Sequence, residues 1–372
     1  MGPASGHLYP IAAPVKVAAA GNRQIQSIQA LRAVAATSVI FRHIPFAGWG
    51  GFGVDIFFVV SGFVMCYVSF LDSRAFLIKR IIRIVPLYWF GTLGVFAVAL
   101  LSPALLHNTS ADWNHLLKSL LFIPYMREDH TIRPVLFLGW TLEYEAFFYV
   151  VFALGLACAR GKLATGRHKY AYACTALFLA LAAALGQTLR PASIALRFYT
   201  NPVILEFAFG AIAFLLWNRY RDRIAQTPIV WAIAVALLAY TAFLMFDLKI
   251  MDSHGAYLGK IPGFVWRGGL GFLLCISFLS LEGKIRFPKL WLLIGDASYS
   301  LYVFHPYVVE LIDRKMISLR FLTPATVAAA SIAIVACFVV AILSFQFFER
   351  PTNSFLRKKF VKSRPRLAVA GP

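Results

Sequence analysis

Apolar residues run along the chain in long stretches separated by short polar links. About ten of these stretches reach the roughly 17 to 25 residues that a helix needs to cross the hydrocarbon core of a membrane. They lie at 26–45, 52–71, 84–106, 135–158, 170–188, 201–217, 228–247, 262–281, 290–311 and 323–348. The pattern predicts an all-α membrane protein with about ten transmembrane helices in one bundle. A further apolar piece, "LLKSLLFIPY" at 116–125, is too short to span and is expected to be interfacial or re-entrant.

The polar segments divide the chain into three parts. Residues 1–24 are predicted to be a flexible cytoplasmic tail, because their apolar piece "IAAPVKVAAA" is interrupted by proline and lysine and makes a poor signal peptide. Residues 25–350 hold all of the long apolar stretches and are predicted to form one transmembrane domain. Residues 351–372 are expected to form a basic cytoplasmic tail.

Composition supports a polytopic membrane protein. The chain is 60% hydrophobic and only 14% charged, whereas a soluble domain is about 45–50% apolar and about 25% charged. The five cysteines include no CxxC pair, so neither a disulfide framework nor a zinc site is indicated, and we expect no metal. In a soluble protein, a net charge of +20 would suggest that the protein binds nucleic acid. Here Lys and Arg are concentrated in every second segment between the apolar stretches, which is a topology signal and argues against nucleic-acid binding. The same pattern predicts that both termini lie in the cytoplasm.

The first apolar stretch contains two polar groups that are costly in a membrane, Arg32 and His43. Their spacing of eleven residues corresponds to about 1100° of helix rotation, so both lie on one face and are about 16 Å apart along the axis. This arrangement suits a path through the protein better than a single ion pair. The alternative is that Arg32 extends to the inner headgroups while His43 lies at the outer interface.

The second stretch, "GVDIFFVVSGFVMCYVSF", places Asp55 at the depth of His43, because the connection between the two helices is a short turn. A carboxylate within reach of an imidazole can fix its tautomer and raise its basicity. The pair Ser61-Gly62 in the middle of this stretch is expected to let two helices approach closely rather than to supply a catalytic serine.

Basic residues precede the third stretch in "RAFLIKRIIRIVPLYW". Arg80 and Arg83 are three residues apart, so they share a helical face and can clamp a phosphate. A topology signal of the positive-inside kind explains a basic link at this place equally well.

Acidic residues interrupt the fourth stretch in "LGWTLEYEAFFYV". Glu143 and Glu145 are two residues apart and point in nearly opposite directions, so only one is expected to face a cavity. The other intramembrane polar groups are Glu206, Arg267, Asp296 and His305. Each of these four can simply pair with another group inside the bundle. Among the intramembrane polar residues, Glu143 and His305 are in addition candidate substrate-binding residues.

Five motifs in order resemble a known family. They are the Arg-x10-His pattern of Arg32 and His43, "GVDIFFVVSGF", the Arg-x2-Arg pattern of Arg80 and Arg83 followed by "IVPLYW", "WTLEYEAFFY", and "SYSLYVFHPYV". Together they resemble acyltransferase family 3, and most of all its subgroup that acetylates bacterial exopolysaccharides. The resemblance covers about residues 24–350.

The resemblance implies an enzyme of the bacterial inner membrane that moves an acyl group, usually acetyl, from cytoplasmic acyl-CoA to a glycan hydroxyl. The acceptor is then a glycan or a lipid-linked oligosaccharide. His43 corresponds to the catalytic histidine, Arg32 to its partner in the pore, and Arg80 and Arg83 to the residues that bind the phosphates of coenzyme A. Glu145 matches the buried glutamate of the family's "SLxxE" segment. That segment reads "TLEYE" here, which leaves open whether Glu143 or Glu145 matters.

The residues and the resemblance lead to one mechanistic hypothesis. Coenzyme A docks by its phosphates at the cytoplasmic face, its pantetheine arm passes Arg32, and the thioester lies near His43. Neutral His43, oriented by Asp55 or Glu145, acts as general base on the sugar hydroxyl or carries the acyl group itself. Two alternatives from other classes are a transporter or flippase for a glycan precursor and a noncatalytic partner of a polysaccharide synthase.

Overall fold

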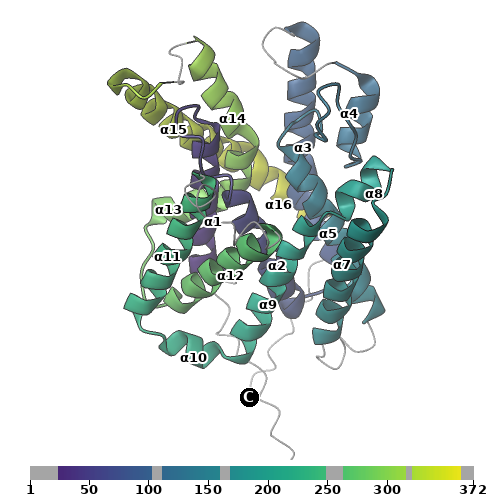
Figure 1. The fold of residues 1–372 in the computed structure, drawn as a ribbon, viewed down its shortest axis with the longest axis vertical. Coiled ribbons are helices and arrows are strands. Elements are labelled where there is room, and N and C mark those ends of the chain that lie inside the picture. Colours follow the sequence, from purple (N-terminus) through teal and green to yellow (C-terminus); the bar gives the residue numbers. More distant parts are fainter. Residues whose placement is uncertain (1–23, 103–110, 160–167, 249–262, 316–320, 362–372) are drawn as a thin grey trace, which may run out of the picture.

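The structure is a computed structural model that describes residues 24–102, 111–159, 168–248, 263–315 and 321–361. Within these ranges the chain is built from helices, with no β-strand beyond an isolated bridge between Met126 and Ile132 (Figure 1). The predicted all-α class is therefore confirmed. Most of the tail predicted at residues 1–24 lies outside the described residues.

Every predicted stretch contains a helix. The long helices are α1 (Gln26–His43), α2 (Gly53–Leu71), α3 (Phe76–Leu101), α5 (Gly139–Cys158), α7 (Lys169–Leu189), α9 (Glu206–Arg219), α11 (Ile229–Asp247), α12 (Gly263–Leu281), α14 (Ser298–Lys315) and α15 (Pro324–Ser344). The short ones are α4 (Trp113–Leu120), α8 (Ile194–Tyr199), η2 (Pro202–Leu205), α10 (Arg221–Gln226), α13 (Lys289–Asp296), the π-helical η4 (Phe345–Glu349) and α16 (Arg350–Phe360).

In the part of the chain that is described, eight helical segments are long and apolar enough to cross a membrane. The helices α1 and α14 are not among them, because polar and charged residues interrupt their apolar sequences. Both are nevertheless enclosed by other helices: α1 packs against α2, α12, α13 and α14, and most of its side chains are buried. The protein thus places its most polar long helices at the centre of a membrane-embedded bundle.

Glycines bring α2 and α9 into close contact, as the sequence pattern predicted. A Cβ atom on Gly62 would lie 2.0 Å from the carbonyl oxygen of Phe207, and one on Gly210 would lie 1.9 Å from that of Val59. No side chain fits at either position, so the two backbones touch directly. This contact fixes α2, and with it the residues that α2 presents to the interior.

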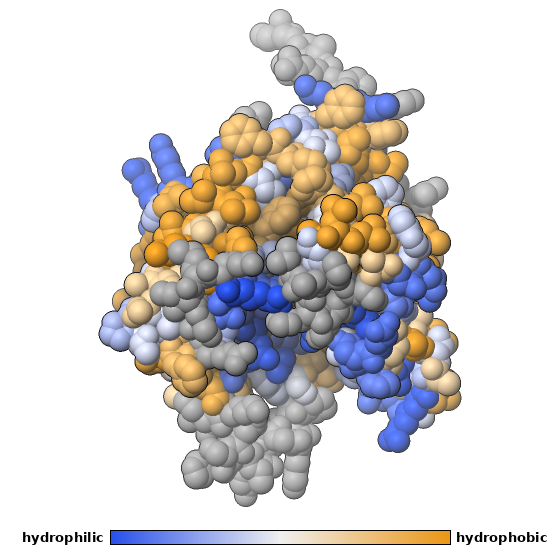
Figure 2. All heavy atoms as spheres, turned by 90° about the horizontal axis from the view of Figure 1, so that it is seen from above, coloured by the Kyte–Doolittle hydropathy of each residue, from blue (hydrophilic) through white to orange (hydrophobic). Residues whose placement is uncertain are grey.

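At the upper end of the bundle in Figure 1, α14 and α15 lie on one side and α3 and α4 on the other. Seen from above, hydrophilic residues gather at the centre of this face, between apolar groups (Figure 2). At the opposite end, α15 continues through η4 into α16, which packs against α3. Residues 351–360 of the expected basic tail therefore belong to a helix attached to the bundle, and residues 362–372 lie outside the described ranges.

Candidate functional site

A central cavity lies between α2, α3, α5 and α14 and spans about 510 Å³ including space open to solvent, of which about 60 Å³ is accessible to the centres of water molecules. Its polar wall brings together two predicted site residues, Arg83 and Glu145, with Ser61 and Ser298. The remaining lining residues are Val54, Phe57, Phe58, Thr141, Leu142, Tyr299 and Tyr302. A cavity with mostly apolar walls and a few convergent polar groups is the usual form of a small-molecule site.

Arg32 is attached to the wall of this cavity. Its side chain is buried, and its Nη2 donates to Ser298 Oγ at 2.7 Å while its Nη1 donates to Gln29 Oε1 at 3.0 Å. Ser298 is a lining residue and the first residue of α14, directly after the break between α13 and α14. The predicted interior arginine is therefore held by neutral oxygens, which leaves its charge available to the cavity.

Glu145 is the carboxylate that faces the cavity. Its Oε1 accepts a hydrogen bond from Ser61 Oγ at 3.0 Å and another from the hydroxyl of Tyr149, one turn along α5. Glu143, on the opposite face of α5, is fully buried and lines neither of the two largest cavities. Its two carboxylate oxygens have no hydrogen-bond partner among the described residues. The geometry thus separates the two glutamates and gives no support to Glu143 as a substrate-binding residue.

His43, the last residue of α1, meets His305 in the middle of α14. Their ring centroids are 5.0 Å apart, with the planes inclined at 67°. His305 Nδ1 lies 2.9 Å from the carbonyl oxygen of Leu301, so Nδ1 carries the proton and Nε2 is the acceptor. Nε2 is buried and has no hydrogen-bond partner in the described part of the chain. Tyr302 lines the cavity and its ring centroid is 6.0 Å from that of His305, so it adjoins both the cavity and the histidine pair.

Asp55 does not contact His43, so the expected pairing of these two residues is wrong. The Asp55 carboxylate instead lies 3.7 Å from Nη1 of Arg267 on α12 and within electrostatic range of Glu206 on α9. The expected common depth is not found either, because Gly53, two residues before Asp55, packs against the backbone of Ala35, about two turns before His43. The described contacts of Asp55 join α2, α9 and α12.

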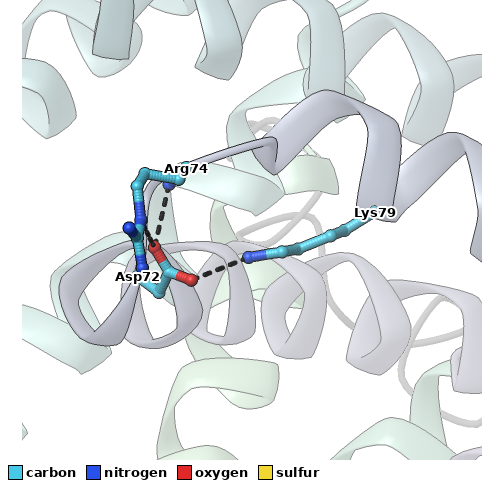
Figure 3. Close-up of polar contacts among 3 residues, drawn as sticks. All are labelled: Asp72, Arg74 and Lys79. Carbon is cyan, nitrogen blue, oxygen red and sulfur yellow. Dashed lines mark hydrogen bonds and ion pairs between the residues drawn. The ribbon is translucent and has the colours of Figure 1, made fainter. Parts of the chain in front are cut away.

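The basic residues of the α2–α3 link fall into two groups. Asp72 accepts hydrogen bonds from Arg74 Nε at 3.1 Å and from Lys79 Nζ at 3.0 Å (Figure 3). Partial burial of Asp72 opposes ionisation, but these hydrogen bonds outweigh it and lower the pKa of the carboxyl to about 2. Arg80 and Arg83 form no ion pair within the described residues, and Arg80 is buried with its Nε unpartnered. Two of the four cations are thus used by the fold, and two remain for an anion.

Sequence reasoning missed Glu349. This buried carboxylate at the end of the π-helical η4 accepts a hydrogen bond from Ser300 Oγ at 2.7 Å. It lies within electrostatic range of both Arg32 and Arg83. The available signal was an acidic residue directly after the last apolar stretch, in "FQFFERP". π-helical turns are rare and often occur at functional sites.

A second, larger groove runs between α3 and α14 and spans about 1040 Å³ including space open to solvent, of which about 400 Å³ is accessible to the centres of water molecules. Its floor includes Gly91 and Gly94, and its other wall includes Phe304 and Tyr307 on either side of His305 along α14. The Phe137 ring lies between the two features: its centroid is 5.7 Å from that of His43 and 6.2 Å from that of Tyr307. The groove therefore adjoins the histidine pair from the side of the bundle.

Comparison with known proteins identifies the family. The profile of the acyltransferase domain, acyltransferase family 3, matches residues 25–345, and the chain belongs to this family. It is 34% identical over 310 residues to the exopolysaccharide production protein ExoZ of Rhizobium meliloti, covering 81% of this chain and 89% of ExoZ. No solved structure matches the chain.

Other relatives are named for peptidoglycan. The chain is 27% identical over 390 residues to the putative peptidoglycan O-acetyltransferase YrhL of Bacillus subtilis, covering 91% of this chain and 57% of YrhL. It is 24% identical over 375 residues to the peptidoglycan O-acetyltransferase OatA of Listeria monocytogenes, covering 90% of this chain and 57% of OatA. The chain thus spans somewhat more than half the length of these two relatives. Family and fold together define an integral membrane acyltransferase.

Proposed function

We propose that the protein transfers an acetyl group from cytoplasmic acetyl-CoA to a hydroxyl group of a cell-surface glycan, of the exopolysaccharide class. The observation that carries this proposal is the arrangement of charges along the bundle. Arg80 and Arg83, which form no ion pair among the described residues, lie near one end of a cavity that holds Glu145, and the His43–His305 pair lies beyond its other end. Such a molecule has an anion site and a base on opposite sides of a membrane-embedded cavity.

The donor enters from the arginine end. A guanidinium group forms paired, charge-assisted hydrogen bonds with phosphate oxygens, so Arg80 and Arg83 suit the phosphates of coenzyme A. Orientation follows from this assignment: the arginine end is cytoplasmic, the protein lies in the bacterial inner membrane, and both termini are cytoplasmic. The cavity beside Arg83 then receives the pantetheine arm, with Arg32 and Glu145 along its path.

Transfer takes place near His43. In the direct route, the ring of neutral His43 accepts the proton of the sugar hydroxyl while the hydroxyl oxygen attacks the thioester carbonyl. The carbon–sulfur bond breaks, and the coenzyme A thiolate leaves with the proton that His43 has taken up. In the covalent route, His43 attacks the thioester first and then passes the acetyl group to the hydroxyl. In either route, the Nε2 lone pair of His305 can accept the N–H of His43 and so fix its tautomer.

The acceptor approaches from the opposite end. The groove between α3 and α14 is apolar, opens to the side of the bundle and adjoins the histidine pair through Phe137. It suits the lipid chain of a lipid-linked oligosaccharide, whose sugar then lies next to His43. An acceptor that is already polymerised needs no such groove.

The test uses the purified protein in lipid nanodiscs with radiolabelled acetyl-CoA and fractionated cell-surface glycan. We expect base-labile label on the glycan with the wild type, and loss of at least about a hundredfold in rate with His43→Asn. The matched control is His130→Asn, an exposed histidine whose positive φ of 58° asparagine tolerates. Incubation without glycan separates the two routes, because only the covalent route leaves label on the protein.

Two outcomes would overturn the proposal. If His43→Asn acetylates glycan as fast as the wild type at equal protein level, His43 is not the base. If cells that carry His43→Asn lose polymer export but retain acetyl esters on the remaining polymer, the protein is a transporter of a glycan precursor.

A further inference from the structure

The helix α16 packs along α3 in a register that one aromatic contact defines. The rings of Phe348, just before α16, and Phe90 on α3 have centroids 4.7 Å apart. Arg357 lies nine residues beyond Phe348, which corresponds to about 14 Å of helix. On α3, Arg83 and Arg80 lie seven and ten residues before Phe90, or about 10 to 15 Å along the axis. Since the two helices run in opposite directions, Arg357 is level with the interval between Arg80 and Arg83.

The charges at this level confirm the register. Arg357 lies within electrostatic range of Arg83 on one side, and Arg80 lies within range of both. None of the three takes part in an ion pair within the described chain, although Glu145 lies within electrostatic range of Arg80. Three guanidinium groups in one place repel each other, and an anion bound among them relieves the repulsion.

The three arginines differ in access. Arg80 is buried, Arg83 is half-buried and lines the cavity, and Arg357 is exposed on α16. The cluster therefore extends from the cavity outward to the surface. Its extent matters because coenzyme A carries phosphate at two separate places, a diphosphate next to the pantetheine arm and a monophosphate on the ribose. A donor whose arm occupies the cavity has its diphosphate near Arg83 and its ribose monophosphate farther out.

We propose that Arg357 is a third donor-binding residue, which binds the ribose phosphate of the donor and so makes the enzyme selective for coenzyme A over donors that lack this phosphate. The inference rests on the proposed function, because it takes acyl-CoA as the donor. It gives α16 a role in the site, whereas the sequence suggested only a basic tail at this place.

The experiment removes each partner of the contact in turn. Initial rates are measured in nanodiscs with acetyl-CoA and with acetyl-dephospho-CoA, for the wild type and Arg357→Gln. We expect Arg357→Gln to raise the KM for acetyl-CoA about 5- to 20-fold with kcat unchanged, as removal of one charged hydrogen-bond pair does. With acetyl-dephospho-CoA, the two proteins should have the same KM within about twofold. Arg357→Lys should be intermediate with acetyl-CoA, because lysine keeps the charge but loses the paired geometry.

The matched control is Lys359→Gln, which removes a cation from the same exposed part of α16. If Lys359→Gln raises the KM for acetyl-CoA as much as Arg357→Gln, the effect is general surface charge and the proposal is wrong. It is equally wrong if Arg357→Gln raises the KM for both donors by the same factor. An Arg357→Gln protein that elutes as a single peak on size exclusion is folded, so its raised KM reports a binding defect. An intermediate KM for Arg357→Lys supports the same interpretation.

Failure of this inference is distinguishable from failure of the proposed function. If Arg80→Gln and Arg83→Gln raise the KM for acetyl-CoA but Arg357→Gln does not, only the role of Arg357 falls. If the wild type transfers no acetyl group from acetyl-CoA, the donor assignment falls, and the proposal for Arg357 falls with it.

Discussion

The imidazole rings of His43 and His305 lie 5.0 Å apart between centroids and are inclined at 67°, with the Nε2 acceptor of His305 unpartnered among the described residues. In the proposed mechanism, His305 therefore takes the orienting place expected for Asp55. Because its Nδ1 is held by the carbonyl of Leu301, the ring cannot rotate without losing a hydrogen bond.

This relationship predicts different effects for two substitutions of His305. His305→Phe keeps the ring volume but removes the acceptor, so kcat should fall about 10- to 100-fold through loss of orientation of His43. His305→Gln supplies an amide oxygen in a similar place and should keep more activity than His305→Phe. The KM for acetyl-CoA, whose phosphates are proposed to bind at Arg80 and Arg83, should change less than about twofold in both. Equal rates for the two variants would contradict the orienting role.

A second prediction concerns the two glutamates of α5. Glu145→Gln removes the charge that faces the cavity beside Arg83 and should lower the transfer rate at least about tenfold. Glu143→Gln should leave the rate within about twofold, because this side chain lines neither cavity. The same assay measures both, with protein levels matched by fluorescence-detected size exclusion. If the Glu143 variant loses more activity than the Glu145 variant, the cavity is not the donor path.

A third prediction concerns the link between Arg32 and α14. Ser298→Ala removes an acceptor of a charged hydrogen bond, so it should cost about 1.5 to 3 kcal/mol in transition-state stabilisation or in stability. Ser300→Ala is the comparison, because it removes a hydroxyl two residues away that binds Glu349 rather than Arg32. Thermal unfolding measures the loss of stability, and the transfer rate measures the loss of transition-state stabilisation, so both are determined for each variant. If Ser298→Ala affects neither, Arg32 is held by Gln29 alone.

The sequence predicted the class of fold because the membrane imposes it: a chain that spans lipid must satisfy its backbone within helices, and helices need long apolar stretches. It also predicted that Arg32 and His43 lie on one face, since both are on a single regular helix. The depth of Asp55 was not predicted, because the connection returns along α1 before α2 begins, so that Gly53 lies beside Ala35 rather than beside His43.

Rotation about each helix axis was not predictable. The sequence does not say whether Asp55 faces α1 or α12, and the contact of α2 with α9 decides this. The same holds for α5, where the spacing of two residues separates Glu143 from Glu145 but packing selects the one that faces the cavity. Glu349 and Arg357 were missed because polar residues after a last apolar stretch resemble an ordinary tail.

The backbone contact between α2 and α9 leads to a last prediction, which tests the packing that positions the site. Gly62→Ala places a Cβ atom 2.0 Å from the carbonyl oxygen of Phe207, a distance that no Cβ can adopt, so the helices must separate. Overpacking of this kind costs about 1–3 kcal/mol. We therefore expect Gly62→Ala to lower the melting temperature in detergent by several degrees.

Gly94→Ala on α3 is the matched control for this substitution. Both glycines lie within long helices, but a Cβ on Gly94 would meet no atom within 4 Å. Alanine also favours helix over glycine by roughly 0.8–1.0 kcal/mol, so Gly94→Ala should raise the melting temperature slightly or leave it unchanged. Because Ser61 lies beside Gly62 and donates to Glu145, separation of α2 from α9 should also lower the transfer rate of Gly62→Ala. A Gly62→Ala protein as stable as the Gly94 variant and as active as the wild type would show that α2 and α9 are not in direct backbone contact.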